Sequence, residues 1–146
     1  MTAIVKDLPV GVAGDLTREN AAIVEYGALD GSVEYGSPVV FDSTKNAFRA
    51  VTAGDTKFYG VLSRVAPATP DAKDASVMIR GYIKVKVNGN PKRGDVVNVY
   101  TTDGGSGKSI GTFAAAAEAG KTVEFTGATF AVNGADDNGI TVIRIL

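Results

Sequence analysis

The stretch of this chain that most resembles a functional motif is TTDGGSGKS, residues 101–109. It ends in Gly-Lys-Ser, as the phosphate-binding loop of nucleotide-binding proteins does, where glycine backbone and lysine hold the phosphates. That motif needs Gly or Ala where this chain has Thr102. It also needs a buried parallel strand before it and a helix directly after it. Neither is indicated here, so we interpret the stretch as a glycine-rich, mobile connection between strands.

Two other motifs have turn explanations. The tripeptide Arg-Gly-Asp within KRGD matches a cell-adhesion motif, but Gly94 and Asp95 are also typical turn residues. The cluster GADDNG offers the oxygens of Asp136, Asp137 and Asn138, which is a conceivable calcium set. The spacing lacks the alternating ligands of an EF-hand loop. We therefore predict turns at both places.

The residue types that are missing narrow the function further. The chain has no His and no Cys, which excludes an imidazole base, a thiolate nucleophile, a disulfide and Cys-based metal sites. A carboxylate-dependent enzyme is the remaining enzymatic class, the least favoured of those considered. Its candidates are scattered among predicted turns: Asp30, Glu34, Asp42, Asp55 and Asp103. We predict no catalytic, cofactor-binding or metal-binding residue and no cofactor.

The charges argue against two classes of partner. Lys and Arg number 15 and Asp and Glu 16, for a formal net charge of −1, without the basic excess of a nucleic-acid binder. No apolar run is long enough to span a bilayer. The first residues lack the apolar block of a signal peptide. We expect no contact with nucleic acid or membrane, and synthesis in the cytoplasm.

Residues 21–146 have the pattern of a β domain. Short apolar runs rich in Val, Ile, Thr, Tyr and Phe alternate with turn signals. The clearest is GYIKVKVNG, where Ile83, Val85 and Val87 share one face. Residues 114–119 have helix propensity, or form an irregular loop. We predict an all-β single domain, a jelly-roll or barrel-like sandwich of about ten short antiparallel strands, with no internal repeat in the sequence.

Residues 1–20 are expected to form an extended N-terminal arm. The segment mixes apolar residues with Pro9, Gly11 and Gly14 and has no clear period. It carries too many apolar side chains for a solvated tail, so it should lie against something. Either it folds back on its own domain or it contacts a neighbouring subunit. A short helix beginning near Asp15 is a further alternative.

Several segments together resemble the structural cement, or head-decoration, proteins of tailed bacteriophages. They are GVAGDLTREN, VEYGSPVVFDSTKNAFRAVTAGDTKFYGVLSR, ASVMIRGYIKVKVNGNPKRGDVVNVYTTDGG, GATFAV and ITVIRI, in this order and nearly over the whole chain. The resemblance implies a β-rich fold on the outside of a capsid. It implies a non-enzymatic protein that bridges major capsid subunits and stabilises the shell against internal DNA pressure. The family offers no catalytic residues to transfer.

The resemblance also sets the expected partners. They are the major capsid protein and the chain itself, as a homodimer or alternatively a trimer, on the outer capsid surface of the virion. We expect the arm to supply one contact region, through Val10, Val12, Leu16 and Arg18. The alternative function is a carbohydrate- or receptor-binding module of a phage fibre or head surface. The sugar-stacking candidates would then be Tyr26, Tyr35, Tyr59, Tyr82 and Tyr100.

Overall fold

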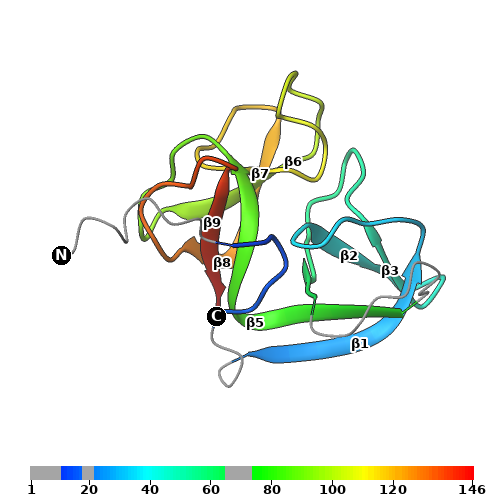
Figure 1. Ribbon diagram of the computed structural model, residues 1–146. Helices are drawn as coiled ribbons and strands as arrows, with labels where there is room; N and C mark the ends of the chain where they lie inside the picture. Colours follow the sequence, from blue (N-terminus) through cyan, green and yellow to red (C-terminus); the bar gives the residue numbers. More distant parts are fainter. Residues whose placement is uncertain (1–10, 18–21, 65–73) are drawn as a thin grey trace.

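A computed structural model describes residues 11–17, 22–64 and 74–146, and these residues form an all-β, barrel-like arrangement (Figure 1). No helix occurs among them, so none that could cross a membrane. Nine strands carry the fold: β1 (Ile23–Asp30), β2 (Pro38–Asp42), β3 (Ala47–Ala50), β4 (Gly60–Leu62), β5 (Asp74–Asn88), β6 (Val96–Tyr100), β7 (Phe113–Ala114), β8 (Thr122–Phe130) and β9 (Ile140–Ile145).

The long strand β5 joins two halves of the molecule. Its first part, Asp74–Arg80, pairs with β1 and β4, and its second part, Gly81–Asn88, pairs with β9 and β7. Gly81 stands at the change of partners with a φ of 123°, a conformation that residues with a side chain rarely adopt. In Figure 1 β5 bends here, with β1, β2 and β3 on one side and β6 to β9 on the other.

Each half closes on itself through strand pairing. In the first ring, β1 pairs with β3, β3 with β2, β2 with β4, β4 with the first part of β5, and that part with β1. In the second ring, the second part of β5 pairs with β7, β7 with β6, β6 with β8, β8 with β9, and β9 with β5. Closure leaves few unpaired strand edges.

The second ring repeats the first strand for strand. Both begin with a parallel pair, β1–β3 and β5–β7, and all their other pairings are antiparallel. The backbone bonds match as well. The amide of Gly36 donates to the carbonyl of Leu62 at 2.7 Å, and the amide of Gly94 donates to that of Phe130 at 2.8 Å. The structure therefore contains a repeat that inspection of the sequence did not reveal.

The registers fix which residues are equivalent. Phe48 pairs with Leu29 and Phe41 in the first ring, and Phe113 pairs with Val87 and Val99 in the second. The same registers give three more equivalent pairs: Val61 and Thr129, Leu62 and Phe130, and Met78 and Arg144.

Each ring has an apolar interior, and the junction of the rings is apolar too. The first ring encloses a cluster drawn from its strands: Val39, Phe48, Leu62, Ala75 and Val77. Val61 and Met78 alternate with Leu62 and Val77, so they point out of this ring. They belong to the larger cluster that also holds Phe125, Phe130 and Ile143 of the second ring. Phe58 and Phe125 meet across the junction, with ring centroids 5.5 Å apart.

The predicted β domain is confirmed in class, and several details differ. The apolar runs on both sides of Gly81 form the one long strand β5, and those on both sides of Gly127 form the single strand β8. The pairings β1–β3 and β5–β7 are parallel rather than antiparallel. The alanine-rich segment starts as β7 at Phe113–Ala114 and continues as bends and turns, which fits the irregular-loop alternative.

Candidate functional site

The described part of the predicted arm, residues 11–17, lies along β5. The amide of Gly14 donates to the carbonyl of Lys84 at 2.7 Å, and the amide of Lys84 donates to the carbonyl of Asp15 at 2.9 Å. Leu16 forms an isolated antiparallel bridge with Ile83. This stretch of the chain is therefore held on its own domain.

The four predicted contact residues fall in different surroundings. Val12 is 52% exposed, as an intermolecular contact residue would be before binding. Leu16 is partly buried and packs against the larger core cluster. Val10 and Arg18 lie outside the described residues. The structure does not bring these four residues together as one described surface.

The Gly-Lys-Ser stretch is a connection between β6 and β7. The backbone closes on itself, since the amide of Gly104 donates to the carbonyl of Lys108 at 2.9 Å. The Lys108 Nζ donates to Glu118 Oε1 at 2.8 Å, so the lysine already has a carboxylate partner. A strand follows rather than a helix. The geometry differs from a phosphate-binding loop at each of these points.

The same carboxylate holds a buried tyrosine. Tyr100 is 2% exposed, and its hydroxyl donates to Glu118 Oε1 at 2.8 Å. Burial, as the larger cause, and this hydrogen bond, as the smaller, raise the pKa of Tyr100 to about 12. The hydrogen bonds from Lys108, the larger cause, and from Tyr100 lower the pKa of the Glu118 carboxyl. These three side chains fix the connection onto the second ring.

The Arg-Gly-Asp and Asp-Asp-Asn clusters form turns, as predicted. Gly94 has a φ of 91°, and Asp95 Oδ2 accepts from the amide of Lys92 at 3.2 Å. Asp136 Oδ1 accepts from the amides of Asn138 and Ile140, both at 2.9 Å. Within the described ranges, no three His, Cys, Asp or Glu side chains gather in a way that could hold a metal ion.

Several scattered carboxylates serve ion pairs or turns. Asp55 accepts two bonds from the guanidinium of Arg49, at 2.8 and 2.9 Å. The hydrogen bonds from Arg49 lower the pKa of Asp55. Lys45 Nζ donates to Asp30 Oδ2 at 2.9 Å on the surface, and this bond raises the pKa of Lys45. Asp42 and Asp103 accept from nearby backbone amides. These contacts are structural ones.

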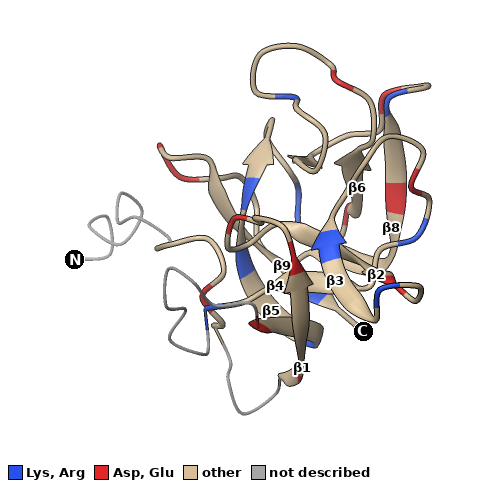
Figure 2. Ribbon diagram, turned by 90° about the vertical axis from the view of Figure 1, so that its right-hand side faces the viewer, with Lys and Arg blue, Asp and Glu red and all other residues tan. Residues whose placement is uncertain are grey.

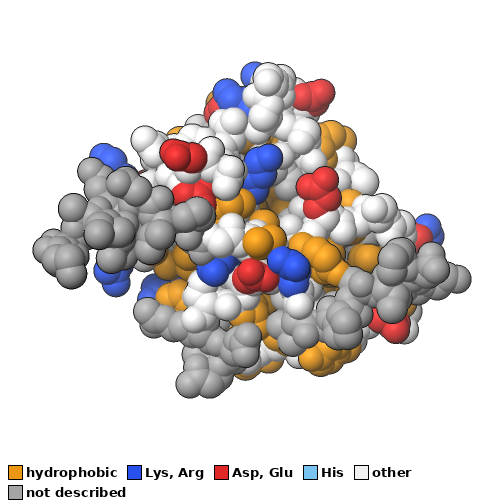
Figure 3. All heavy atoms as spheres, in the orientation of Figure 1, with side chains coloured by type: hydrophobic (Ala, Val, Ile, Leu, Met, Phe, Trp, Pro, Cys, Tyr) orange, Lys and Arg blue, Asp and Glu red, His pale blue; other side chains and the backbone are white. Residues whose placement is uncertain are grey.

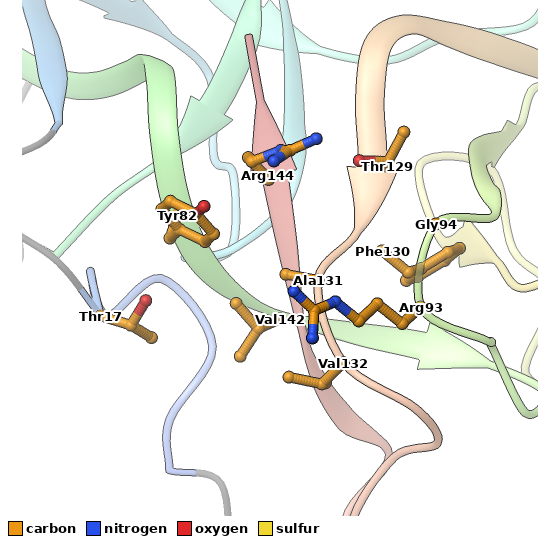
Figure 4. Close-up of a pocket in the computed structure, with 10 residues that line it drawn as sticks. All are labelled: Thr17, Tyr82, Arg93, Gly94, Thr129, Phe130, Ala131, Val132, Val142 and Arg144. Carbon is orange, nitrogen blue, oxygen red and sulfur yellow. The ribbon is translucent and has the colours of Figure 1, made fainter.

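A groove of about 600 Å³ lies on the second ring (Figure 4). Its floor and walls combine two arginines, three hydroxyls and an apolar part. The lining residues are Thr17, Tyr82, Arg93, Gly94, Thr129, Phe130, Ala131, Val132, Val142 and Arg144. In Figure 4 the Arg93 side chain reaches across to Val132, and Arg144 stands on β9 between Tyr82 and Thr129.

The groove is positively charged, and its arginines lack carboxylate partners among the described residues. Neither Arg93 nor Arg144 lies within 4.0 Å of a carboxylate among the described residues. The Nε of Arg144 is buried and has no hydrogen-bond partner there. The charge of the two guanidinium groups that line the groove favours an anionic ligand, because charge-assisted hydrogen bonds are strong.

The rest of the surface mixes apolar and charged groups. Both signs of charge are spread over the strands and loops (Figure 2), and apolar side chains reach the surface between them (Figure 3). A second, smaller hollow of about 250 Å³ lies near Ser32, Ala50 and Ile110. Large apolar side chains that are more than a third exposed are Val12, Ile23, Tyr26, Phe41, Tyr59, Val96, Ile110, Val132 and Leu146.

Comparison with known proteins identifies the family of this chain. Residues 2–146 match the sequence profile of a family described as structural cement protein (E217 gp24/Pam3 gp6). The chain belongs to this family. A solved chain titled "The capsid of Myoviridae Phage XM1" has a similar fold, with a TM-score of 0.77 and 16% identity over 99% of this chain and 95% of that one. No curated protein matches this chain.

For this cement protein, the resemblance noted in the sequence is confirmed, and the groove is the feature that sequence inspection missed. Arg93 was seen only as part of the Arg-Gly-Asp motif, and Arg144 only as one residue of the last strand. They are 51 positions apart and line the same groove because β8 and β9 pair beside the turn that holds Arg93. A charged residue in an otherwise apolar final strand was the available signal.

Proposed function

We propose that this cement protein binds the outer surface of a phage head and clamps adjacent major capsid proteins, stabilising the shell against internal DNA pressure. The observation that carries the proposal is the family match over residues 2–146. The role is structural and non-enzymatic. The protein is made in the host cytoplasm, assembles onto the virion and acts as a homodimer, with a trimer as the alternative.

The physical basis of the clamp would be many modest contacts acting together. Exposed apolar residues such as Ile23, Tyr26 and Val96 offer area for burial at an interface. Aromatic and arginine side chains are typical anchors of protein interfaces. A shell presents the same site many times, so one molecule that touches two subunits gains from effective concentration.

The arm remains our proposed contact region, through Val10, Val12, Leu16 and Arg18. The exposure of Val12 supports an outward contact. Leu16 packs against the core, and Gly14 and Asp15 form backbone hydrogen bonds with the domain. These contacts support a proposal in which residues 14–16 hold the arm on its own domain and the rest of the arm contacts a neighbouring subunit. A truncation should therefore remove residues 1–10 and keep the bonds of Gly14 and Asp15.

The test is decoration of shells that lack this protein. Purified protein is mixed with such shells, and binding is measured by co-sedimentation and electron microscopy. We expect saturable decoration and a higher temperature of shell rupture. The truncation should stay folded by circular dichroism and bind at least tenfold more weakly, as should Val12→Asp. Failure of the full chain to bind any shell would contradict the proposal, whereas normal binding by the truncation would contradict the arm contact alone.

One observation favours the alternative function. Phe41, Phe48 and Tyr59 form an aromatic cluster with ring centroids 5.2–5.7 Å apart, and Phe41 and Tyr59 are 38% and 41% exposed. Exposed aromatic faces can stack on sugar rings. Binding to glycans, lost in Tyr59→Ala, together with no affinity for shells, would favour the carbohydrate-binding alternative.

A further inference from the structure

The groove of the second ring has an equivalent surface on the first ring. By the repeated strand registers and turns, Arg93 and Gly94 correspond to Tyr35 and Gly36. Likewise, Ala131 and Val132 follow Phe130 as Ser63 and Arg64 follow Leu62. The repeat therefore allows a direct comparison of what covers this surface in each ring.

In the first ring, a peptide segment of the chain itself covers this surface. A Cβ atom added to Gly14 would lie 2.8 Å from the Tyr35 Cβ, and one added to Gly36 would lie 2.7 Å from the Ala13 Cβ. The amide of Arg64 donates to the carbonyl of Gly14 at 3.0 Å. The Arg64 guanidinium also lies 3.5 Å from Asp15 Oδ1. The covering segment thus forms a turn at residues 13–14, packs closely and presents the carboxylate of Asp15.

In the second ring, the same surface is the groove. The amide of Val132 corresponds to that of Arg64 and forms no hydrogen bond with the described part of the chain. Val132 is 37% exposed, and Ala131 is only partly buried. Where the first ring has the apolar pair Val61 and Met78, the groove has Thr129 and Arg144. The groove therefore offers the amide of Val132, which is equivalent to the donating amide of Arg64. It also carries more positive charge than the first-ring surface.

We propose that the groove binds an acidic peptide segment of the neighbouring major capsid protein. A main-chain carbonyl of that segment accepts from the amide of Val132, as Gly14 does from Arg64. An Asp or Glu carboxylate accepts from the guanidinium groups of Arg144 and Arg93. This inference rests on the proposed function, since it names the site by which the cement protein holds the shell.

The apolar part of the groove favours a peptide over a small inorganic anion. An anion would use the arginines and leave Ala131, Val132 and Val142 in water. A peptide segment covers these side chains as well, and their burial adds to the charge-assisted bonds. Thr17, at the end of the described arm, borders the groove, so an occupant would also touch the arm.

The first experiment measures the affinity for shells lacking the protein. Arg93→Gln and Arg144→Gln are made singly and together, with Arg80→Gln as a control, because Arg80 is exposed and does not line the groove. We expect the double variant to bind at least about tenfold more weakly and to depend less on salt. The control should bind as the wild type does.

A folding measurement separates a binding role from a structural one. Since Arg144 has no described hydrogen-bond partner at Nε, Arg144→Gln should leave the melting temperature unchanged. If wild type binds shells and the double variant binds equally well, this inference is wrong while the proposed function stands. If wild type binds no shell, the proposed function itself fails.

The second experiment identifies the chemistry of the partner. In Arg93→Lys, the new amine can be coupled to a touching carboxylate by a zero-length carbodiimide reagent, with loss of water. We expect an amide between residue 93 and an Asp or Glu of the capsid protein, identified by mass spectrometry. Arg80→Lys should give no such product. Release of bound protein by inorganic phosphate at low millimolar concentration, without a cross-link, would instead identify a small-anion site and overturn the proposal.

Discussion

The two rings of this protein share their strand order and differ most on their outer faces. In the first ring, the outward pair on β4 and β5 is Val61 and Met78, both fully buried in the junction. In the second ring, the equivalent pair on β8 and β9 is Thr129 and Arg144, which line a groove. The same backbone position thus serves internal packing in one ring and a candidate docking surface in the other.

The interiors of the rings differ in another way. Gly27 on β1 lies against the Phe48 ring, and a Cβ there would come within 2.8 Å of it. The equivalent position in the second ring is Val85, which is fully buried. Each ring therefore fills similar pairings with its own combination of side chains. Packing, rather than residue identity, is what the repeat preserves.

The largest expected effect comes from exchanging the outward pair. Met78→Arg places a charge in the apolar junction, so we expect a loss of more than about 4 kcal/mol in the free energy of unfolding. The matched exchange, Arg144→Met, removes a donor without a described partner and should change that free energy by less than about 1 kcal/mol. Chemical denaturation measures both. Equal losses in the two variants would break the comparison.

Exchanging the interior residues should have an intermediate effect. Gly27→Val forces side-chain atoms against Phe48 and should cost about 1–3 kcal/mol of stability. Adding Phe48→Leu to Gly27→Val should restore part of the loss, because the smaller side chain makes room. If the double variant is less stable by the sum of both single losses, the two positions do not share the space that the structure shows.

The Arg49–Asp55 ion pair of the first ring should make the stability of the protein sensitive to acid. The pKa of Asp55 is lowered in the folded state, so its contribution is present above the unfolded carboxyl pKa of about 3.9 and is lost as the pH falls through the folded value. Asp55→Asn should cost about 1–2 kcal/mol at pH 7. Denaturation at pH 7 and pH 3 should show a smaller acid loss in the variant. An unchanged loss would assign acid sensitivity to other carboxylates.

Tyr100 of the second ring should add a loss of stability at alkaline pH. Tyr100 has its pKa raised from 10.0 to about 12, so its contribution is present below pH 10 and is lost as the pH rises through about 12. Tyr100→Phe should cost about 1 kcal/mol at pH 7 by removing the bond to Glu118. Ultraviolet titration of the tyrosinate should show one late-titrating tyrosine that is missing in the variant.

The sequence predicted the fold class from the alternation of apolar and polar residues, and the family from the order of several short motifs. It did not predict the long strand β5, because Gly81 is typical of a turn and the strand bends there. It did not predict the ring closure either, since β1–β5 and β5–β9 pair residues that are far apart in the chain. Periodicity informs on local structure and carries little information on such pairings.

The candidate site was less predictable than the fold. Val12 and Leu16 were chosen for their apolar side chains, yet only the structure distinguishes the exposed residue from the packed one. Arg93 and Arg144 acquire meaning from the absence of a nearby carboxylate in the described structure, which no single sequence position reports. Surface function here depends on what remains unpaired after folding.

The most direct test is a cryo-electron microscopy map of decorated shells at side-chain resolution. We predict this protein on the outer surface, bridging two capsid subunits, with a capsid carboxylate within hydrogen-bond distance of Arg93 or Arg144. The first-ring surface at Tyr35 and Arg64 should still be covered by the chain's own Ala13–Asp15. A protein absent from the shell, or attached to a single subunit, would contradict the account of a clamp. Attachment across two subunits with the groove facing solvent would contradict the docking surface.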